Sequence, residues 1–359
     1  MADVQPGVMP PPRPDDLPLR GYATTPAYAT TPAGYGAAPS EDRGRTVAGL
    51  HIPGASTLYS LLGLVLLASG ILALIMPYRL SDWFFRDHIT HPDVLYEELW
   101  RILAGSLLTG AITCFGLKVA ADRRQLNDYA VQRLQHGFFW FAAIVILLHL
   151  IHLLFVKTLT FWGLLIGGVV MGLTLLIPAA HLGMSGGFSF QPMWEGIVLC
   201  FGNLFAPRRI TSSVFLYALL TILFTVAGLA YLLLPKLTLR WTFGYDEGDR
   251  SAFLWQCIGA AMVTLFAGIT YTCEERAIQG RLFTTLPKVL NVGLLVSALF
   301  HILEFGSLLV DGGIDGRYLL VGLFVHWVLT LITAIVGLSA TEPPVAAAYE
   351  YEPLGGDNA

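Results

Sequence analysis

Charged residues are scarce in this chain. Only 13% of its 359 residues are Asp, Glu, Lys or Arg, whereas 55% are hydrophobic. Soluble domains typically carry about 25% charged residues, so the composition excludes a water-soluble globule of this size and indicates a membrane protein. The sequence also lacks runs of Lys and Arg, and its formal net charge is −4, which excludes an extended surface for nucleic acid.

Cysteine and catalytic motifs are also scarce. The four cysteines lie in or beside apolar segments without C-x-x-C spacing (Cys114, Cys200, Cys257 and Cys273). That pattern gives no support for a disulfide framework or a zinc site. The sequence has no G-x-S-x-G, H-E-x-x-H or P-loop motif and no loop long enough to form a separate domain. We therefore expect a protein that is not an enzyme of these classes.

The two ends of the chain lack long apolar runs. Residues 1–56 are rich in Pro, Ala, Thr and Gly, contain the sequence YATTPA twice, and include no secretory signal. Such a segment cannot bury enough apolar surface to offset its ordering entropy, so we expect a disordered N-terminal tail. Residues 339–359 are expected to form a shorter C-terminal tail of the same kind.

Apolar stretches of the length that crosses a bilayer, roughly 20 residues, occupy most of the remaining sequence. There are eight: 57–76, 99–119, 137–156, 161–178, 214–234, 253–272, 289–309 and 318–338. They are expected to be helices because unpaired backbone groups are costly in lipid. An even number of spans places both termini on one side. Since that side carries more Lys and Arg than the other, the positive-inside rule predicts cytoplasmic termini.

The two halves of the sequence resemble each other. Tyr59 to Pro77 and Tyr217 to Pro235 match at a constant shift, and each proline is followed by Trp-x-Phe at the same spacing. Trp100 corresponds to Trp255, and His149 is aligned with His301. These matches predict an all-α integral membrane protein made of two tandem four-helix bundles, a parallel repeat. In outline each half is similar to small four-helix membrane proteins of the DoxX-like kind, a likeness of architecture alone.

The predicted domain order follows from this repeat. A first membrane module covers 57–178 and a second covers 214–338, and residues 179–213 join them. Within this linker, residues 193–206 are apolar but too short to span a bilayer, so we expect a helix that lies in the membrane surface.

Polar residues at membrane depth are costly and tend to face a bundle interior, so they are the candidate functional residues. The candidate cofactor-binding residues are His149, His152, His301 and His326. The candidate metal ligands are His301, Glu304 and His326. The residues of a candidate polar path are Arg101, Glu97, Glu98 and Gln256. The aromatic residues that follow the two prolines, Trp83, Phe85, Trp241 and Phe243, are candidate anchors at the membrane interface.

Three functions remain open at this stage. The first is a non-enzymatic scaffold or accessory subunit of a membrane complex, in which the intramembrane polar groups hydrogen-bond across helices and the partners are the lipid bilayer and other membrane proteins. The second is a transporter or channel for a small solute, ion or lipid. The third is an electron-transfer or pigment protein that holds a tetrapyrrole (haem or chlorophyll) through an axial histidine.

Overall fold

The chain is described by a computed structural model, which covers residues 45–47, 50–52, 54–86, 94–184, 198, 202, 211–244, 248–312 and 318–342. Within these residues, eight helices are long and apolar enough to cross a membrane: Ala55–Ile75, Tyr96–Asp122, Tyr129–Val156, Phe161–Gly183, Ser212–Leu233, Asp249–Ile278, Thr285–Val310 and Tyr318–Leu338. The prediction of a multi-pass helical membrane protein is confirmed. Most of both predicted tails and the predicted interfacial helix 193–206 lie outside the described residues.

The helices differ from the predicted stretches mainly at their ends. The third span begins at Tyr129 instead of residue 137, and the sixth runs from Asp249 to Ile278 instead of 253–272. Apolar runs mark the part of a helix that lies in lipid, whereas polar residues continue the same hydrogen-bonded ladder beyond it. The additional turns carry charged side chains that the predicted stretches left in loops.

The elements follow one another in a similar order in the two halves. In the first half they are α1 (Ala55–Ile75), α2 (Pro77–Phe84), α3 (Val94–Asp122), α4 (Tyr129–Ile151), the π-helical turn η2 (His152–Val156) and α5 (Phe161–Met184). In the second half they are α7 (Ser212–Leu233), α8 (Pro235–Phe243), α9 (Asp249–Ala260), the π-helical turn η3 (Ala261–Phe266), α10 (Ala267–Ile278), α11 (Thr285–Gly312) and α12 (Tyr318–Leu338).

A short hairpin precedes the first span, inside the segment predicted to be disordered. Strands β1 (Arg45–Val47) and β2 (Leu50–Ile52) pair antiparallel, with Thr46 opposite His51. These two strands, and the start of α1 at Ala55, lie within the range 1–56 that was predicted as a tail. The two strands contain the β-branched residues Thr46, Val47 and Ile52, which favour an extended backbone.

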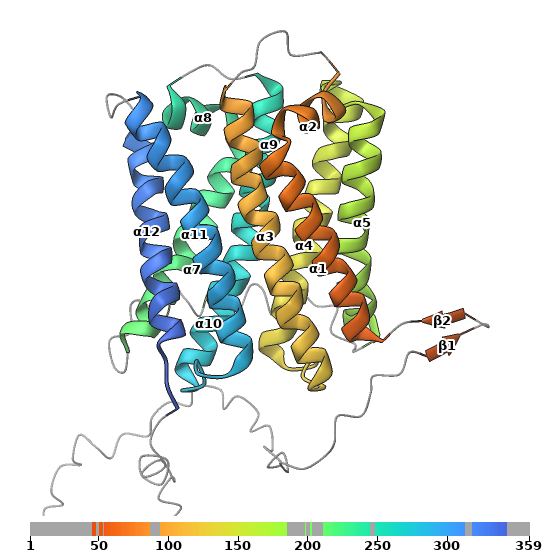
Figure 1. Cartoon of the computed structure of the whole chain (residues 1–359), viewed down its shortest axis with the longest axis vertical. Coiled ribbons are helices and arrows are strands. Elements are labelled where there is room, and N and C mark those ends of the chain that lie inside the picture. The colour runs from red at the N-terminus through yellow and green to blue at the C-terminus, as the bar shows by residue number, and fades with distance from the viewer. Residues whose placement is uncertain are drawn as a thin grey trace, which may run out of the picture. The chain divides into compact units, whose positions relative to one another are not determined.

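Each of the two prolines starts a short helix. Pro77 and Pro235 occupy the first turn of α2 and α8 directly after α1 and α7 end. Proline suits this position because its missing N–H would have no partner there. Both short helices lie at the same end of the bundle (Figure 1), which we call the α2–α8 end.

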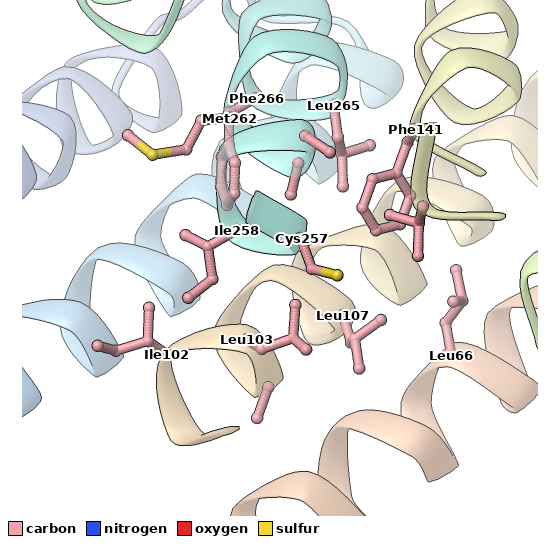
Figure 2. Close-up of a cluster of buried hydrophobic side chains, with 14 of the residues drawn as sticks. Leu66, Ile102, Leu103, Leu107, Phe141, Cys257, Ile258, Met262, Leu265 and Phe266 are labelled. Atoms are coloured by element: carbon pink, nitrogen blue, oxygen red, sulfur yellow. The ribbon is translucent and has the colours of Figure 1, made fainter. Parts of the chain in front are cut away.

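Two helical segments form the centre of the bundle. Buried residues make up 78% of the apolar stretch of the second span (α3) and 89% of that of the sixth (α9, η3 and α10), whereas they make up 33–44% in the other six spans. Leu103 and Leu107 of α3 meet Ile258 and Met262 of the sixth span in a shared apolar core (Figure 2). The outer helices therefore surround a central pair that consists of one helix from each half.

The halves share this core instead of forming separate bundles. Helix α3 packs against α1 of its own half and against α11 of the other half, and these three lie side by side in Figure 1. Helix α4 packs against α5 and also against α9, η3 and α10. Contacts between the halves therefore run through the middle of the molecule.

Candidate functional site

At the α2–α8 end, the residues of the predicted polar path form two separate groups. Arg101 donates to Glu98 at 3.1 Å and to Glu97 at 3.4 Å, all on the first turns of α3. His152 lies 3.3 Å from the side-chain oxygen of Gln256 in α9. Because that oxygen only accepts, Nε2–H of His152 is the donor, and the hydroxyl of Thr158 donates to Nδ1 at 3.0 Å.

His149 has one ring nitrogen bonded and one unbonded. Its Nδ1–H donates to the carbonyl of Val145, one turn earlier in α4, at 2.7 Å. Its Nε2 is buried without a hydrogen-bond partner among the described residues. The rings of Phe84 and Phe253 pack edge-on against the imidazole, with centroids at 6.2 and 5.0 Å. The result is a hydrogen-bond acceptor in apolar surroundings.

His301 and His326 pack around one tryptophan. The ring of His301 stacks on Trp327 at 3.7 Å between centroids, and the ring of His326 lies 5.7 Å from the same indole. Nδ1–H of His301 donates to the carbonyl of Ser297 at 2.7 Å. Both histidines therefore contact the same indole.

The predicted metal ligands do not assemble. In the part of the chain that the structure describes, no three side chains of His, Cys, Asp or Glu are grouped closely enough to hold a metal ion. His301 is held against Trp327, and Glu304 lies one turn later on α11, half-exposed. The spacing of His301 and Glu304 along one helix suggested a shared site. Stacking on Trp327, however, fixes the direction in which the imidazole of His301 points.

A cavity of about 100 Å³ lies next to His149, between α1, α3, α4, α5, α9 and the short helix α2. Pockets that hold drug-sized ligands have volumes of roughly 300–1,000 Å³, and a tetrapyrrole is at least that large. The residues around His149 therefore do not fit a haem or a chlorophyll, although a neutral imidazole is a suitable axial ligand.

The aromatic anchors divide into two pairs. Trp83 and Trp241 are 47% and 56% exposed, as expected for side chains at a membrane interface. Phe85 and Phe243 are instead buried, and they pack against Phe253 and Trp255, respectively. The two phenylalanines are therefore core residues, since the turn of a helix between positions i and i+2 points their side chains to the opposite face.

The opposite end of the bundle holds a polar cluster that sequence reasoning missed. Arg133 of α4 is 5% exposed and donates to Glu275 of α10 at 2.8 Å. Its guanidinium also lies 4.0 Å from the ring centres of both Tyr129 and Tyr271. Arg276 of α10 pairs with Asp128, just before α4, at 3.1 Å. Tyr129 and Arg133 are four residues apart and would share one face of a helix. The sequence could have indicated their contact in this way, but the predicted third span began only at residue 137, which left both residues in a loop.

The two central segments meet each other through apolar side chains. Buried threonines of the two central segments donate to carbonyls four residues earlier in their own helices, at 2.9 Å for Thr109, 2.8 Å for Thr113 and 2.6 Å for Thr264. These bonds satisfy the hydroxyls locally. Between the two polar ends lie leucine, isoleucine, methionine and phenylalanine side chains from α3, α4 and the sixth span (Figure 2).

Comparisons with known proteins do not narrow the function. No protein-family model matches this chain, and no curated protein matches its sequence.

Proposed function

We propose that this protein is a non-enzymatic structural subunit of a membrane assembly, whose outer helix faces contact lipid and the helices of partner proteins. The observation that carries the proposal is the apolar core between the two polar ends. Leu103, Leu107, Ile258 and Met262 fill the space between the central helices, where a transporter for a polar solute would need polar groups that exchange partners.

The polar clusters favour the same role. Arg133, Glu275, Arg276 and Asp128 connect α4 with α10, and Gln256 connects α9 both with His152 and with the carbonyl of Leu232 at 3.1 Å. Each cluster therefore holds the first half against the second. Hydrogen bonds between helices serve as such connections within membranes, and they oppose the movement of one half past the other that alternating access requires.

The outer surface of the bundle provides apolar faces on which lipid and partner helices can pack. Large apolar side chains are exposed on each of the six outer spans, for example Leu64, Leu147, Val169, Val226, Leu303 and Val325. Lipid chains solvate these faces, and helices of other proteins pack on them where small residues and shape permit.

We further propose that the two halves are copies of one four-helix unit, with both termini on the cytoplasmic side. Two helix crossings support the repeat. At Gly70 of α1 a side chain would lie 3.3 Å from the carbonyl of Ala104, and at Gly228 of α7 one would lie 2.8 Å from the carbonyl of Gly259. Each glycine occupies the matching position of its half and faces the matching residue of the next span.

The turns after the central helices also match. Arg124 and Gly280 both have a positive φ, of 56° and 65°, and each donates to the carbonyl three residues earlier. The shift between the halves is 155 residues at the start of the central helices and 156 at these turns. The π-helical turn η3 lies between the two points, and a π-bulge corresponds to one inserted residue.

A shift of 156 residues changes the alignment of His149 with His301. Gly137 of α4 faces Thr264, and Gly293 of α11 faces Thr109, so these glycines correspond at a shift of 156. The same shift places His301 at the position of Val145, one helical turn before the position of His149. Positions four apart share a helix face, which explains why the sequence alone favoured the other alignment.

Two substitutions remove the acceptors of the matched residues Trp100 and Trp255, although the acceptors lie one position apart, since Ser81 corresponds to Leu239 at the shift of 158. Trp100 donates to the hydroxyl of Ser81 at 2.8 Å, and Trp255 donates to that of Thr238 at 2.9 Å. Ser81→Ala and Thr238→Val would each leave a buried indole N–H unpaired, and each is expected to lower the free energy of unfolding by about 1–3 kcal/mol. The measurement is reversible unfolding in mixed micelles titrated with dodecyl sulfate.

The control for this pair is Ser60→Ala, because Ser60 donates within its own helix to Ser56 and leaves no donor unpaired when removed. It is expected to cost less than about 0.5 kcal/mol. A difference of more than about 1 kcal/mol between Ser81→Ala and Thr238→Val would contradict equivalent roles of Trp100 and Trp255.

The structural role is tested by photo-crosslinking in the native membrane. A photoreactive amino acid replaces one exposed residue at a time, Leu64, Leu147, Val169, Val226, Leu303 or Val325, or the buried control Leu294. Protein adducts of one defined size are expected from adjacent exposed positions, and none from Leu294. Lipid adducts alone at all six exposed positions would overturn the proposal.

A flux assay distinguishes the proposed structural role from the alternative that the protein is a transporter. Purified protein in liposomes is expected to pass ions and small solutes no faster than protein-free liposomes. Saturable flux that is lost in the double variant His301→Ala and His326→Ala would instead establish a path past Trp327.

A further inference from the structure

The end of the bundle opposite α2 and α8 (Figure 1) has a surface of exposed cations. Arg123 and Arg124 directly follow the end of α3, Arg281 lies in the turn before α11, and Lys288 lies in the first turn of α11. The guanidinium of Arg123 donates to the hydroxyl of Thr285 at 2.8 Å, which holds the end of α3 next to the start of α11. We call the four cations the basic surface.

The basic surface has no counter-charge within the part of the chain that the structure describes: none of its four residues forms an ion pair there. The acidic residues near α3, α4 and α10 at this end are paired elsewhere or buried. Asp122 pairs with Lys118, Asp128 with Arg276 and Glu275 with Arg133, and Glu274 is fully buried. The first turn of α11 contains no acidic residue. The basic surface therefore keeps its positive charge.

The matching helix crossing in the other half is neutral. At the shift of 156 residues, α10 corresponds to α3 and α4 corresponds to α11. There the pairs Arg133–Glu275 and Arg276–Asp128 balance two cations with two acids. The positions that match Arg123, Arg281 and Lys288 all hold glutamine, namely Gln279, Gln125 and Gln132. One crossing thus contains its own counter-charges, whereas the other leaves its cations to an anion from outside the chain.

An exposed apolar strip follows Lys288 along α11. Val292 and Leu299 are 41% and 44% exposed, and Leu295 between them is partly exposed. These residues lie four, seven and eleven positions after Lys288, so they share its helix face. Leu299 is about 16 Å from Lys288 along the helix axis, and one leaflet of hydrocarbon is about 15 Å thick. The face therefore matches a molecule with an anionic head group and a hydrocarbon chain.

The chemistry of the basic surface favours a phosphate without a neighbouring cation. Arginine presents N–H donors in a fork that fits phosphate oxygens, and lysine adds a compact positive charge. A zwitterionic phospholipid such as phosphatidylcholine carries its own ammonium group, which four cations repel. An anionic phospholipid carries no such group, so it gains the full electrostatic attraction.

We propose that the basic surface and the apolar strip of α11 bind an anionic phospholipid, whose phosphate is held by cations of the basic surface and whose acyl chain lies along Val292, Leu295 and Leu299. This site needs no protein partner, so its failure would leave the structural role proposed above untouched.

The test is native mass spectrometry of the purified full chain in a non-ionic detergent. The probes are dioleoyl phosphatidylglycerol and dioleoyl phosphatidylcholine, which have the same chains and differ in net charge. The wild-type chain is expected to bind phosphatidylglycerol about 25-fold more tightly, since two cations that reach one phosphate contribute about fivefold each. Equal affinities would overturn the proposal, and this comparison does not depend on the folding of any variant.

Two double variants locate the preference. Arg281→Gln with Lys288→Gln copies the neutral residues Gln125 and Gln132 of the other half, and it is expected to lower the preference for phosphatidylglycerol at least about fivefold. The matched control, Arg79→Gln with Lys157→Gln, removes two exposed cations at the α2–α8 end and is expected to leave the preference unchanged. An equal loss in both double variants would show that the basic surface is not the site.

Two further measurements identify the ligand as a lipid. Phosphatidylglycerol with a diazirine in its acyl chain is expected to label α11 between Val292 and Leu299 most strongly, and equal labelling of all outer spans would contradict the apolar strip. Glycerol 3-phosphate in excess is expected not to displace the lipid, because it lacks the chain. Displacement would instead identify a site for a soluble phosphate and refute the proposal.

Discussion

Replacement of Arg133 with alanine is expected to lower the free energy of unfolding by about 3 kcal/mol, near the lower limit for breaking a buried ion pair. The side chain of Arg133 is 4% exposed and that of its partner Glu275, 2.8 Å away, is 23% exposed, so solvent screens the pair only in part. The variant also removes the cation from between the rings of Tyr129 and Tyr271, a contact that contributes further stability when it is desolvated.

The control for Arg133→Ala is Lys118→Ala. Lys118 pairs with Asp122 at 2.7 Å, but both side chains are well exposed, at 39% and 45%, and exposed pairs contribute about 0–1 kcal/mol. Unfolding in mixed micelles is the measurement for both. The Arg133 cluster would not be a connection between the halves if its loss cost no more than the loss of Lys118.

The positions of the membrane helices could be predicted from the sequence because lipid imposes a simple rule: a spanning segment satisfies its backbone internally and presents apolar side chains. The stretch 318–338 and the helix Tyr318–Leu338 coincide for this reason. Polar helix ends could not be predicted in this way. Arg133 lies within α4 and is stabilised by contacts with α10, which depend on how the helices pack.

The candidate site was predictable only in its residue types. Histidines at membrane depth are unusual enough to identify His149 and His301 as buried groups, which they are. Which nitrogen is free depends on the carbonyl four residues earlier, and what lies next to it depends on neighbours such as Gly167 and Trp327. These neighbours come from other turns and other helices, so helical spacing could not reveal the cavity at His149 or the stacking of His301 on Trp327.

Replacement of Gly228 with valine is expected to have the other large effect, a loss of about 3 kcal/mol in the free energy of unfolding, at the upper end of the cost of overpacking a core. A Cβ atom at this position would lie 2.6 Å from the backbone nitrogen of Val263 and 2.8 Å from the carbonyl oxygen of Gly259. Neither backbone atom can rotate away as a side chain can. Helix α7 would therefore have to move away from the central segment, and contacts along the whole crossing would weaken.

Gly228→Ala separates the steric cause from helix propensity. Alanine is the best helix former and is favoured over glycine by about 1 kcal/mol in a helix, so destabilisation by alanine must come from the contact itself. The matched controls are Gly172→Ala in α5 and Gly322→Ala in α12, where a side chain would meet nothing within 4 Å; both are expected to be neutral or stabilising. If Gly228→Ala behaves like these controls, α7 and the central segment lie farther apart at this crossing than in the structure. The corresponding crossing at Gly70 then no longer supports the repeat.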